Sequence, residues 1–225
     1  MGGRIKTEKR ETLGLPILGK IKCGVLSDKG YPMSTDYFVA TGKYASLFHD
    51  VYGEKPSSLL IYFPSDDAEL VCNEQYVYRD NKGKKIAYGD GEVFWVYSAR
   101  TQARVRVTTD EMPDVMEVVS NKFPSEKGWE ITLTIRFVLP LVNKIYGVWE
   151  FSTKGAASTI PQIRDCFDGM LERNGKIAGV LCDLNVKFAK SDSPKASRFP
   201  VVSLIPNESD SNVAKIKELP KALNA

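Results

Sequence analysis

The sequence predicts an α+β fold, with largely antiparallel sheet and about three helices. One observation is a series of short runs in which apolar and polar residues alternate, most regularly at 129–137. A second is apolar residues at helical spacing in three longer segments. A third is size, because 225 residues with 43% hydrophobic side chains can build an ordinary buried core.

The first fifty residues of the expected domain read as a strand, a turn and a helix. A strand is expected at 13–24, with Pro16 near its start and Gly24 at its end. A turn-rich stretch and a short extended segment follow. A helix is expected at 43–51 and ends at Gly53. Its apolar face has the spacing i, i+3, i+4, i+7: Tyr44, Leu47, Phe48 and Val51.

The middle of the chain reads as an antiparallel meander. Strands are expected at 57–63, 70–78, 85–89 and 92–97, separated by the turn sequences PSDD, RDNKGKK and GDG. A helix follows, capped by Thr108 or Thr109, because a hydroxyl there precedes acidic residues and an apolar side.

The C-terminal half has the order strand, strand, helix, strand. Strands are expected at 129–137, 145–151, 180–188 and 200–205, with a helix at about 158–173 that stops at Asn174-Gly175. This order is compatible with a ferredoxin-like or RNA-recognition-like arrangement. The organisation predicted is a charged arm at 1–14, one α+β domain at 15–206 and a polar tail at 207–225.

Composition narrows the classes of function. The net charge of +3, from 31 basic and 28 acidic residues, excludes a strongly basic nucleic-acid binder. The charged opening and the lack of a long apolar run predict a cytoplasmic protein with no membrane partner. The four cysteines are scattered, so we expect free thiols, no metal site and no cofactor.

The sequence offers little for catalysis. Its one histidine, His49, lies in an expected helix and is interpreted as a surface or helix-end residue. Phosphate-binding loops of the common nucleotide-binding types are absent. The acidic residues could bind a hard cation, yet turn chemistry explains most of them: Asp66, Asp67 and Asp90, with Glu69 and Glu92 nearby.

The segment FSTKGAASTIPQI leads from a strand into a helix N-terminus. Its free N–H groups, one ammonium and three hydroxyls could hold a phosphate or carboxylate; the side chains are Thr153, Lys154, Ser158 and Thr159. The alternative is that Ser158 or Thr159 caps the helix and no ligand binds.

The stretch SARTQARVRV supplies a second candidate site. Arg100, Arg104 and Arg106 follow the aromatic run of Phe94, Trp95 and Tyr97, and in a strand Arg104 and Arg106 share a face. They could track a phosphate backbone while the aromatic rings stack on bases. The alternative is a solvated face with the aromatic residues in the core.

Five segments in order resemble recombination directionality factor-like proteins of phages and mobile elements. They are LPILGKIKCG, YPMSTDYFVATGKYASLFHDVYGEKPSSLLIYFPSDD, YGDGEVFWVY, FSTKGAASTIPQI and FPVVSLIP, and the likeness runs from about Leu15 to Pro206. The resemblance implies a non-catalytic accessory protein that binds a large serine integrase on DNA and turns the reaction from integration to excision. It implies no catalytic residues.

Three hypotheses follow. The first is a recombination accessory protein, not an enzyme, which contacts a recombinase, an integrase or another DNA-processing protein. The alternative is a single-stranded nucleic-acid or guide-RNA-associated binding protein that contacts DNA or RNA through the arginines and Lys154. The third is an enzyme acting on a phosphorylated ligand at 152–160, and it lacks an identifiable acid/base pair.

Overall fold

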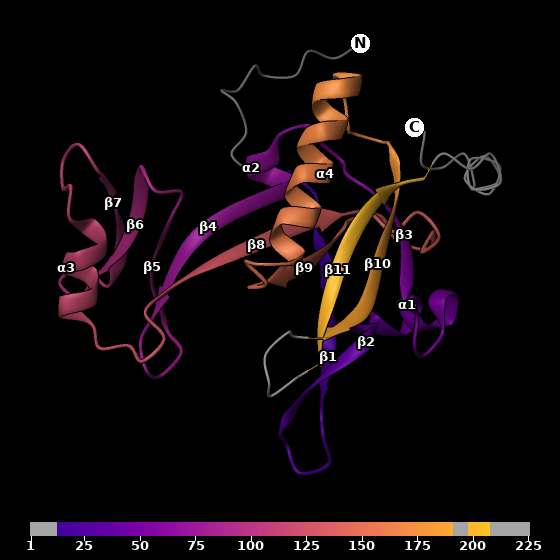
Figure 1. Ribbon diagram of the computed structural model, residues 1–225, viewed down its shortest axis with the longest axis horizontal. Helices are drawn as coiled ribbons and strands as arrows, with labels where there is room; N and C mark the ends of the chain where they lie inside the picture. The colour runs from indigo at the N-terminus through magenta and orange to yellow at the C-terminus, as the bar shows by residue number, and fades with distance from the viewer. Residues whose placement is uncertain (1–12, 191–197, 208–225) are drawn as a thin grey trace.

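The alternating segments form two sheets in the computed structural model of the chain, which describes residues 13–190 and 198–207 (Figure 1). The large sheet has eight strands in the order β2-β1-β9-β8-β4-β5-β6-β7, and the small sheet has the order β11-β10-β3. All strand pairs within them are antiparallel except β1 with β9. The prediction of an α+β fold with largely antiparallel sheets is confirmed.

The elements have the following bounds. The large sheet contains β1 (Ile17–Leu26), β2 (Pro32–Thr41), β4 (Cys72–Arg79), β5 (Lys85–Gly89), β6 (Val93–Ser98), β7 (Ala103–Thr108), β8 (Trp129–Phe137) and β9 (Val148–Thr153). The small sheet contains β3 (Ser58–Tyr62), β10 (Leu181–Lys190) and β11 (Arg198–Pro206). The helices are α1 (Ala45–Tyr52), α2 (Ala68–Val71), α3 (Val115–Lys122) and α4 (Thr159–Asn174).

The C-terminal half keeps the expected order but divides between the sheets. Strands β8 and β9 belong to the large sheet, whereas β10 and β11 pair with β3 in the small one. A ferredoxin-like domain needs these strands in a single sheet, so that arrangement is not formed. The separation arises because β3 supplies the backbone partner of β10, from Leu59 opposite Leu184 to Tyr62 opposite Leu181.

A large lobe, formed by the described residues on either side of 76–129, encloses the main hydrophobic core between the two sheets and α4. Helix α4 buries residues at helical spacing, including Ile160, Ile163, Phe167 and Met170, and packs on β11. The ring of Phe167 meets that of Phe63 edge to face, with centroids 5.1 Å apart. These contacts fix α4 over the sheets, as Figure 1 shows.

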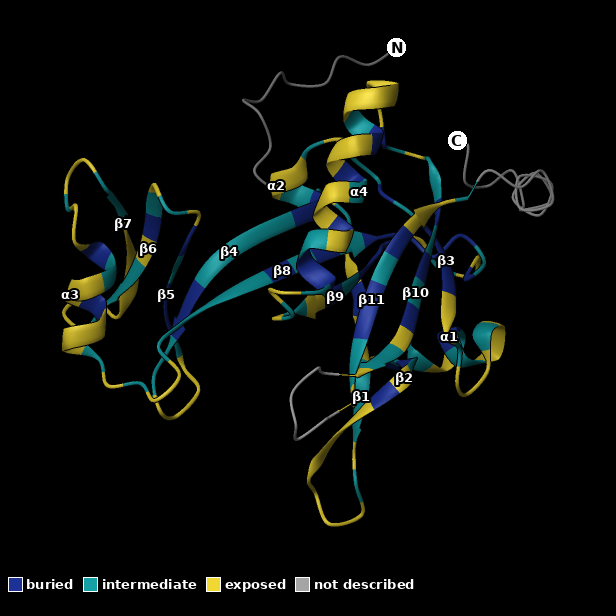
Figure 2. Ribbon diagram, in the orientation of Figure 1, coloured by how far each residue is buried: buried dark blue, intermediate teal, exposed yellow. Residues whose placement is uncertain are grey.

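A small lobe, residues 76–129, has its own hydrophobic cluster at the other end of the large sheet (Figures 1 and 2). Helix α3 covers β5 and β6 with Val115 and Val119, which pack with Phe94. The Tyr78 hydroxyl donates to the carbonyl of Phe123 at 2.7 Å, and so ties the end of α3 to β4. Strands β4 and β8 run through both lobes, and they carry the sheet from one cluster to the other.

Several predicted boundaries are corrected. Residues 70 and 71 belong to α2 rather than to a strand, because Asp67 accepts a hydrogen bond from the Glu69 N–H and starts a helical turn. Helix α3 begins after Asp114, whereas Thr108 ends β7, so neither Thr108 nor Thr109 is its cap. Strand β1 continues past Gly24, where a Cβ would lie 2.9 Å from the Met33 carbonyl oxygen. That glycine therefore permits close strand approach instead of ending the strand.

Other local predictions are confirmed. Strand β8 occupies 129–137, and Gly175 ends α4 in the left-handed region with φ of 65°. His49 lies in the last turn of α1, with Nδ1 3.2 Å from the carbonyl oxygen of Gly53. The expected arm and tail lie outside the described residues, apart from 13–14 and 207. No helix in the described part of the chain is long and apolar enough to span a bilayer.

The four cysteines are free thiols, as predicted. Burial raises the pKa of Cys23, Cys72 and Cys182 to about 12. Since the thiolate is the reactive form, we expect these three to resist alkylation at mildly alkaline pH in the folded protein and to react fully in denaturant. Mass spectrometry of iodoacetamide-treated protein measures this. Rapid labelling of all three in the native state would contradict the packing described here.

Candidate functional site

The large sheet has one buried face and one open, polar face. On β8, Leu133, Ile135 and Phe137 enter the core, so the alternate residues point the other way. A groove of about 660 Å³ runs across this open face over β1, β9, β8, β4 and β5. Its lining includes five cationic side chains, two carboxylates and a row of hydroxyl and amide groups: Lys20, Arg79, Lys85, Arg136, Lys154, Glu69, Glu150, Thr132, Thr134, Ser152, Asn73 and Gln75.

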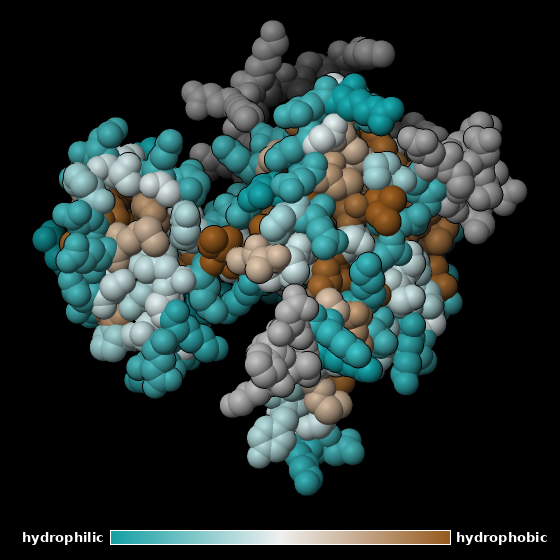
Figure 3. Space-filling model, viewed as in Figure 1, coloured by the Kyte–Doolittle hydropathy of each residue, from teal (hydrophilic) through white to brown (hydrophobic). Residues whose placement is uncertain are grey.

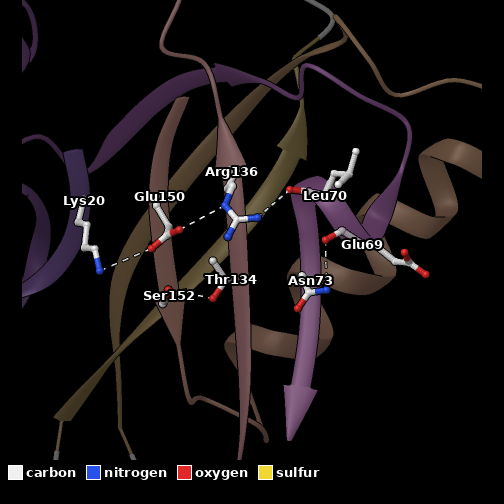
Figure 4. A network of polar contacts seen from close by, with 8 residues as sticks. All are labelled: Lys20, Glu69, Leu70, Asn73, Thr134, Arg136, Glu150 and Ser152. Carbon is white, nitrogen blue, oxygen red and sulfur yellow. Dashed lines mark hydrogen bonds and ion pairs between the residues drawn. The ribbon is translucent and has the colours of Figure 1, made fainter. Parts of the chain in front are cut away.

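At the large-lobe end of the groove the cations are paired (Figure 4). Glu150 lies between Lys20, at 3.6 Å, and the Arg136 Nε, at 3.2 Å. Arg136 also donates to the carbonyl of Leu70 at 3.2 Å, which joins β8 to α2. Lys154 pairs with Glu130. The positive charge at this end is therefore largely balanced.

At the small-lobe end two cations, Lys85 and Arg104, lie over the ring of Tyr88, and Arg79 is opposite Lys85 in the β4–β5 register. We call Arg79, Lys85, Arg104 and Tyr88 the Tyr88 cluster. Lys85 Nζ lies 4.9 Å and the Arg104 guanidinium 5.6 Å from the Tyr88 ring centroid. Arg104 donates to the carbonyl of Lys85 at 3.1 Å, and Arg79 to that of Gly83 at 3.2 Å. Burial, together with the charges of Arg79 and Arg104, lowers the pKa of Lys85. Among the described residues, no ion pair joins these three cations to a carboxylate.

The predicted arginines separate in the structure. Arg104 and Arg106 share a face of β7, opposite Tyr97 and Trp95 of β6, as their spacing predicts. Arg104 belongs to the Tyr88 cluster. Arg106 lines an adjoining cleft of about 730 Å³ between the lobes, together with Glu69, Glu74 and Asp90, and Figure 3 shows the hollow there. Arg100 is exposed in the turn between β6 and β7.

The side chains of the 152–160 segment are largely engaged within the protein. The Thr153 hydroxyl accepts from the Gly155 N–H at 3.1 Å, and Lys154 pairs with Glu130. Thr159 is buried, and its hydroxyl accepts from the Val202 N–H at 3.1 Å. Ser158 stands at the N-cap but makes no side-chain capping bond. The Thr153 hydroxyl thus stabilises the loop and the Thr159 hydroxyl joins α4 to β11, and neither caps the helix.

The acidic residues considered as cation ligands have structural roles. Asp90 accepts from the N–H groups of Glu92 and Val93, as turn chemistry predicts. Asp66 instead forms a long-range clasp, because one carboxylate oxygen accepts from the N–H groups of Ile177 at 2.7 Å and Ala178 at 2.6 Å. Within the described ranges, no three metal-ligating side chains are grouped to hold an ion.

The Asp66 clasp should contribute to stability at neutral pH. The Ala178 and Ile177 N–H groups lower the pKa of Asp66, so its contribution is present above the usual aspartate range and is lost as pH falls through the depressed value. We expect Asp66→Ala to lower the free energy of unfolding by about 1–2 kcal/mol, a figure kept modest because Asp66 is exposed. Urea titrations at neutral and strongly acidic pH measure it. The control is Asp165→Ala, which removes an exposed carboxylate paired with its neighbour Arg164. An equal loss for both variants would refute the clasp.

The sequence interpretation did not include most of the groove. The groove residues come from four separate strands, and no local motif links them: Lys20, Arg79, Lys85, Tyr88 and Arg136. One signal was present, because Arg79 and Lys85 are the first and last residues of the turn sequence RDNKGKK.

A comparison with known protein families shows which family the chain belongs to. The profile of the Gp3-like family, described as recombination directionality factor-like, matches residues 18–207. The chain belongs to the recombination directionality factor-like family. No curated protein and no solved structure matches it. The span matched to this recombination directionality factor-like family crosses both sheets and all four described helices, so both lobes belong to the family's common sequence.

Proposed function

We propose that the protein is a non-catalytic accessory factor of phage or mobile-element DNA recombination, acting in the cytoplasm by contact with an integrase bound to DNA. The observation that carries the proposal is the family match over 18–207. The near-neutral net charge of +3 supports action through protein contact, which does not require strong intrinsic affinity for DNA.

The β1–β2 hairpin is the contact surface we favour. It projects from the large lobe, where Figures 1 and 2 show an exposed tip. Leu26, Tyr31 and Met33 lie on either side of the turn and are 72%, 68% and 51% exposed. Exposed apolar side chains gathered on one projection are typical of a protein contact. The turn is ordered by a hydrogen bond from the Ser27 N–H to the Tyr31 carbonyl at 2.8 Å.

A recombination assay tests the function. A serine integrase from the same mobile element is supplied with the hybrid sites that flank an integrated element, with and without the purified protein. We expect excision only when the protein is present, and inhibition of integration between the unrecombined sites. An integrase whose products are unchanged in both directions would refute the proposal.

The hairpin surface is tested separately by binding. Replacing Tyr31 and Met33 by serine should weaken the complex with integrase at least roughly tenfold, because truncated hot-spot residues commonly cost more than about 1.4 kcal/mol. Ile205→Ser serves as the control, since Ile205 is equally exposed but lies on β11. Biolayer interferometry with immobilised integrase measures both. Equal affinities would place the contact elsewhere.

A further inference from the structure

The Tyr88 cluster concentrates positive charge that no ion pair among the described residues neutralises. Arg104 donates to the Lys85 carbonyl and Arg79 is opposite Lys85 in register, and burial together with these two guanidinium groups lowers the pKa of Lys85. Each arginine donates one hydrogen bond to a backbone carbonyl, and its other N–H groups can donate to a ligand. Repulsion between the three like charges is unfavourable in the unliganded protein, and a bound anion would offset it.

The groove continues from this cluster over neutral polar side chains before it reaches the ion pairs of Glu150 with Lys20 and Arg136. Its floor carries the hydroxyls of Thr132 and Ser152 and the amides of Asn73 and Gln75, which can donate to phosphate or sugar oxygens. Its volume of about 660 Å³ exceeds what one phosphate group fills. The groove therefore has room for several linked groups rather than a single ion.

An aromatic surface lies directly beside the cluster. Tyr88 of β5 and Trp95 of β6 are opposite each other in register, so their side chains share the open face. Trp95 is 40% exposed, whereas its neighbour Phe94 is buried in the small lobe. On its other side Trp95 is opposite Arg106 of β7, and with Arg106 it lines the adjoining cleft. An exposed indole beside cations is an arrangement that single-stranded nucleic acids use, with phosphates on the cations and a base on the ring.

We propose that the Tyr88 cluster and the groove beyond it bind the backbone of a single-stranded nucleic acid, with Trp95 stacking on one unpaired base. Charge complementarity identifies the occupant, and the hydroxyl and amide floor accommodates its sugar and phosphate oxygens. The binding is independent of integrase contact, so it can be tested on the protein alone.

Fluorescence anisotropy with the full chain tests the proposal, using labelled oligothymidylate, oligouridylate and a mixed-sequence duplex. Three phosphate contacts predict a salt slope of about −2, which is a roughly twentyfold loss of affinity between about 50 and 200 mM salt. Binding of either single strand above the duplex is expected, and the DNA and RNA arms show which polymer is preferred. Competition by polyglutamate at equal charge, without preference for a strand, would overturn the proposal in favour of an acidic protein segment.

Charge variants locate the site. Arg79→Gln with Arg104→Gln should reduce the slope by about 1.4 and the affinity at low salt by tenfold or more. The matched control, Lys144→Gln with Arg173→Gln, removes the same charge from exposed positions outside the groove. Arg79→Lys with Arg104→Lys retains the charge and should retain most of the slope. Equal losses in the first and control pairs would overturn the assignment.

Ring variants test the stacking. Trp95→Ala should weaken single-strand binding roughly fivefold to a hundredfold without changing the salt slope, and Trp95→Phe should recover much of it. Thermal melts of each variant confirm that the small lobe remains folded. Unchanged affinity in a folded Trp95→Ala variant, or no binding of any strand by the parent protein, would overturn the proposal.

Discussion

Replacement of Phe167 by alanine is expected to lower the free energy of unfolding by about 3–5 kcal/mol. The side chain is fully buried on α4 and meets the ring of Phe63, which follows β3. Removing it leaves a cavity between α4 and the two sheets and also loses an aromatic pair. Because most small domains have only about 5–15 kcal/mol of stability, the variant should lose a large share of it.

Urea denaturation followed by circular dichroism measures this loss. Ile205→Ala provides the control, since Ile205 on β11 is about half exposed and its truncation removes little buried surface. A loss below about 1 kcal/mol for Phe167→Ala would mean that α4 does not pack on the sheets as described.

Replacement of Phe94 by alanine is expected to unfold the small lobe while the large lobe stays folded. Phe94 is buried, and its ring lies 5.6 Å from that of Trp129 in a cluster much smaller than the main core. A truncation that lowers the free energy of unfolding by about 3–5 kcal/mol removes a large share of the stability that so small a cluster can provide. Hydrogen exchange should then show lost protection in β5, β6, β7 and α3 and retained protection in β10 and α4.

Val105→Ala is the comparison for Phe94→Ala. Val105 lies on β7 of the same lobe and is largely exposed, so its truncation should leave exchange rates nearly unchanged. Uniform loss of protection throughout the chain in Phe94→Ala would show that the lobes unfold as one cooperative unit.

The sequence predicts elements best where one periodicity governs a whole segment. Strand β8 was predicted to the residue because apolar and polar side chains alternate without interruption. The start of α3 was misplaced because the hydroxyl and acidic residues after Thr108 resemble a cap, whereas Glu111 folds back to accept from the Thr108 N–H. The division of β8, β9, β10 and β11 between two sheets depends on pairing with distant strands, which no local pattern encodes.

The candidate site was predictable only within a single strand. The shared face of Arg104 and Arg106 follows from period two and is confirmed by their register with β6. The union of Arg104 with Arg79 and Lys85 requires the order of β4, β5, β6 and β7 in the sheet. Thr159 was interpreted as an anion-binding hydroxyl or a helix cap, but it is buried and accepts from the Val202 N–H of β11. Both the grouping of the cations and the burial of Thr159 depend on contacts between segments that are distant in the sequence.

The strand order also determines which strands can pair while the chain is still being synthesised on the ribosome. The small lobe is one continuous stretch, 76–129, so all its strands and α3 emerge together and can pair at once. Strand β1 must wait for β9, and β3 for β10, which is made near the end of the described chain. Until then β3 presents its apolar side chains and its backbone groups to other nascent chains. A chain that stops before β10 should therefore retain a structured small lobe and aggregate through β3, because its partner in the small sheet has not been made.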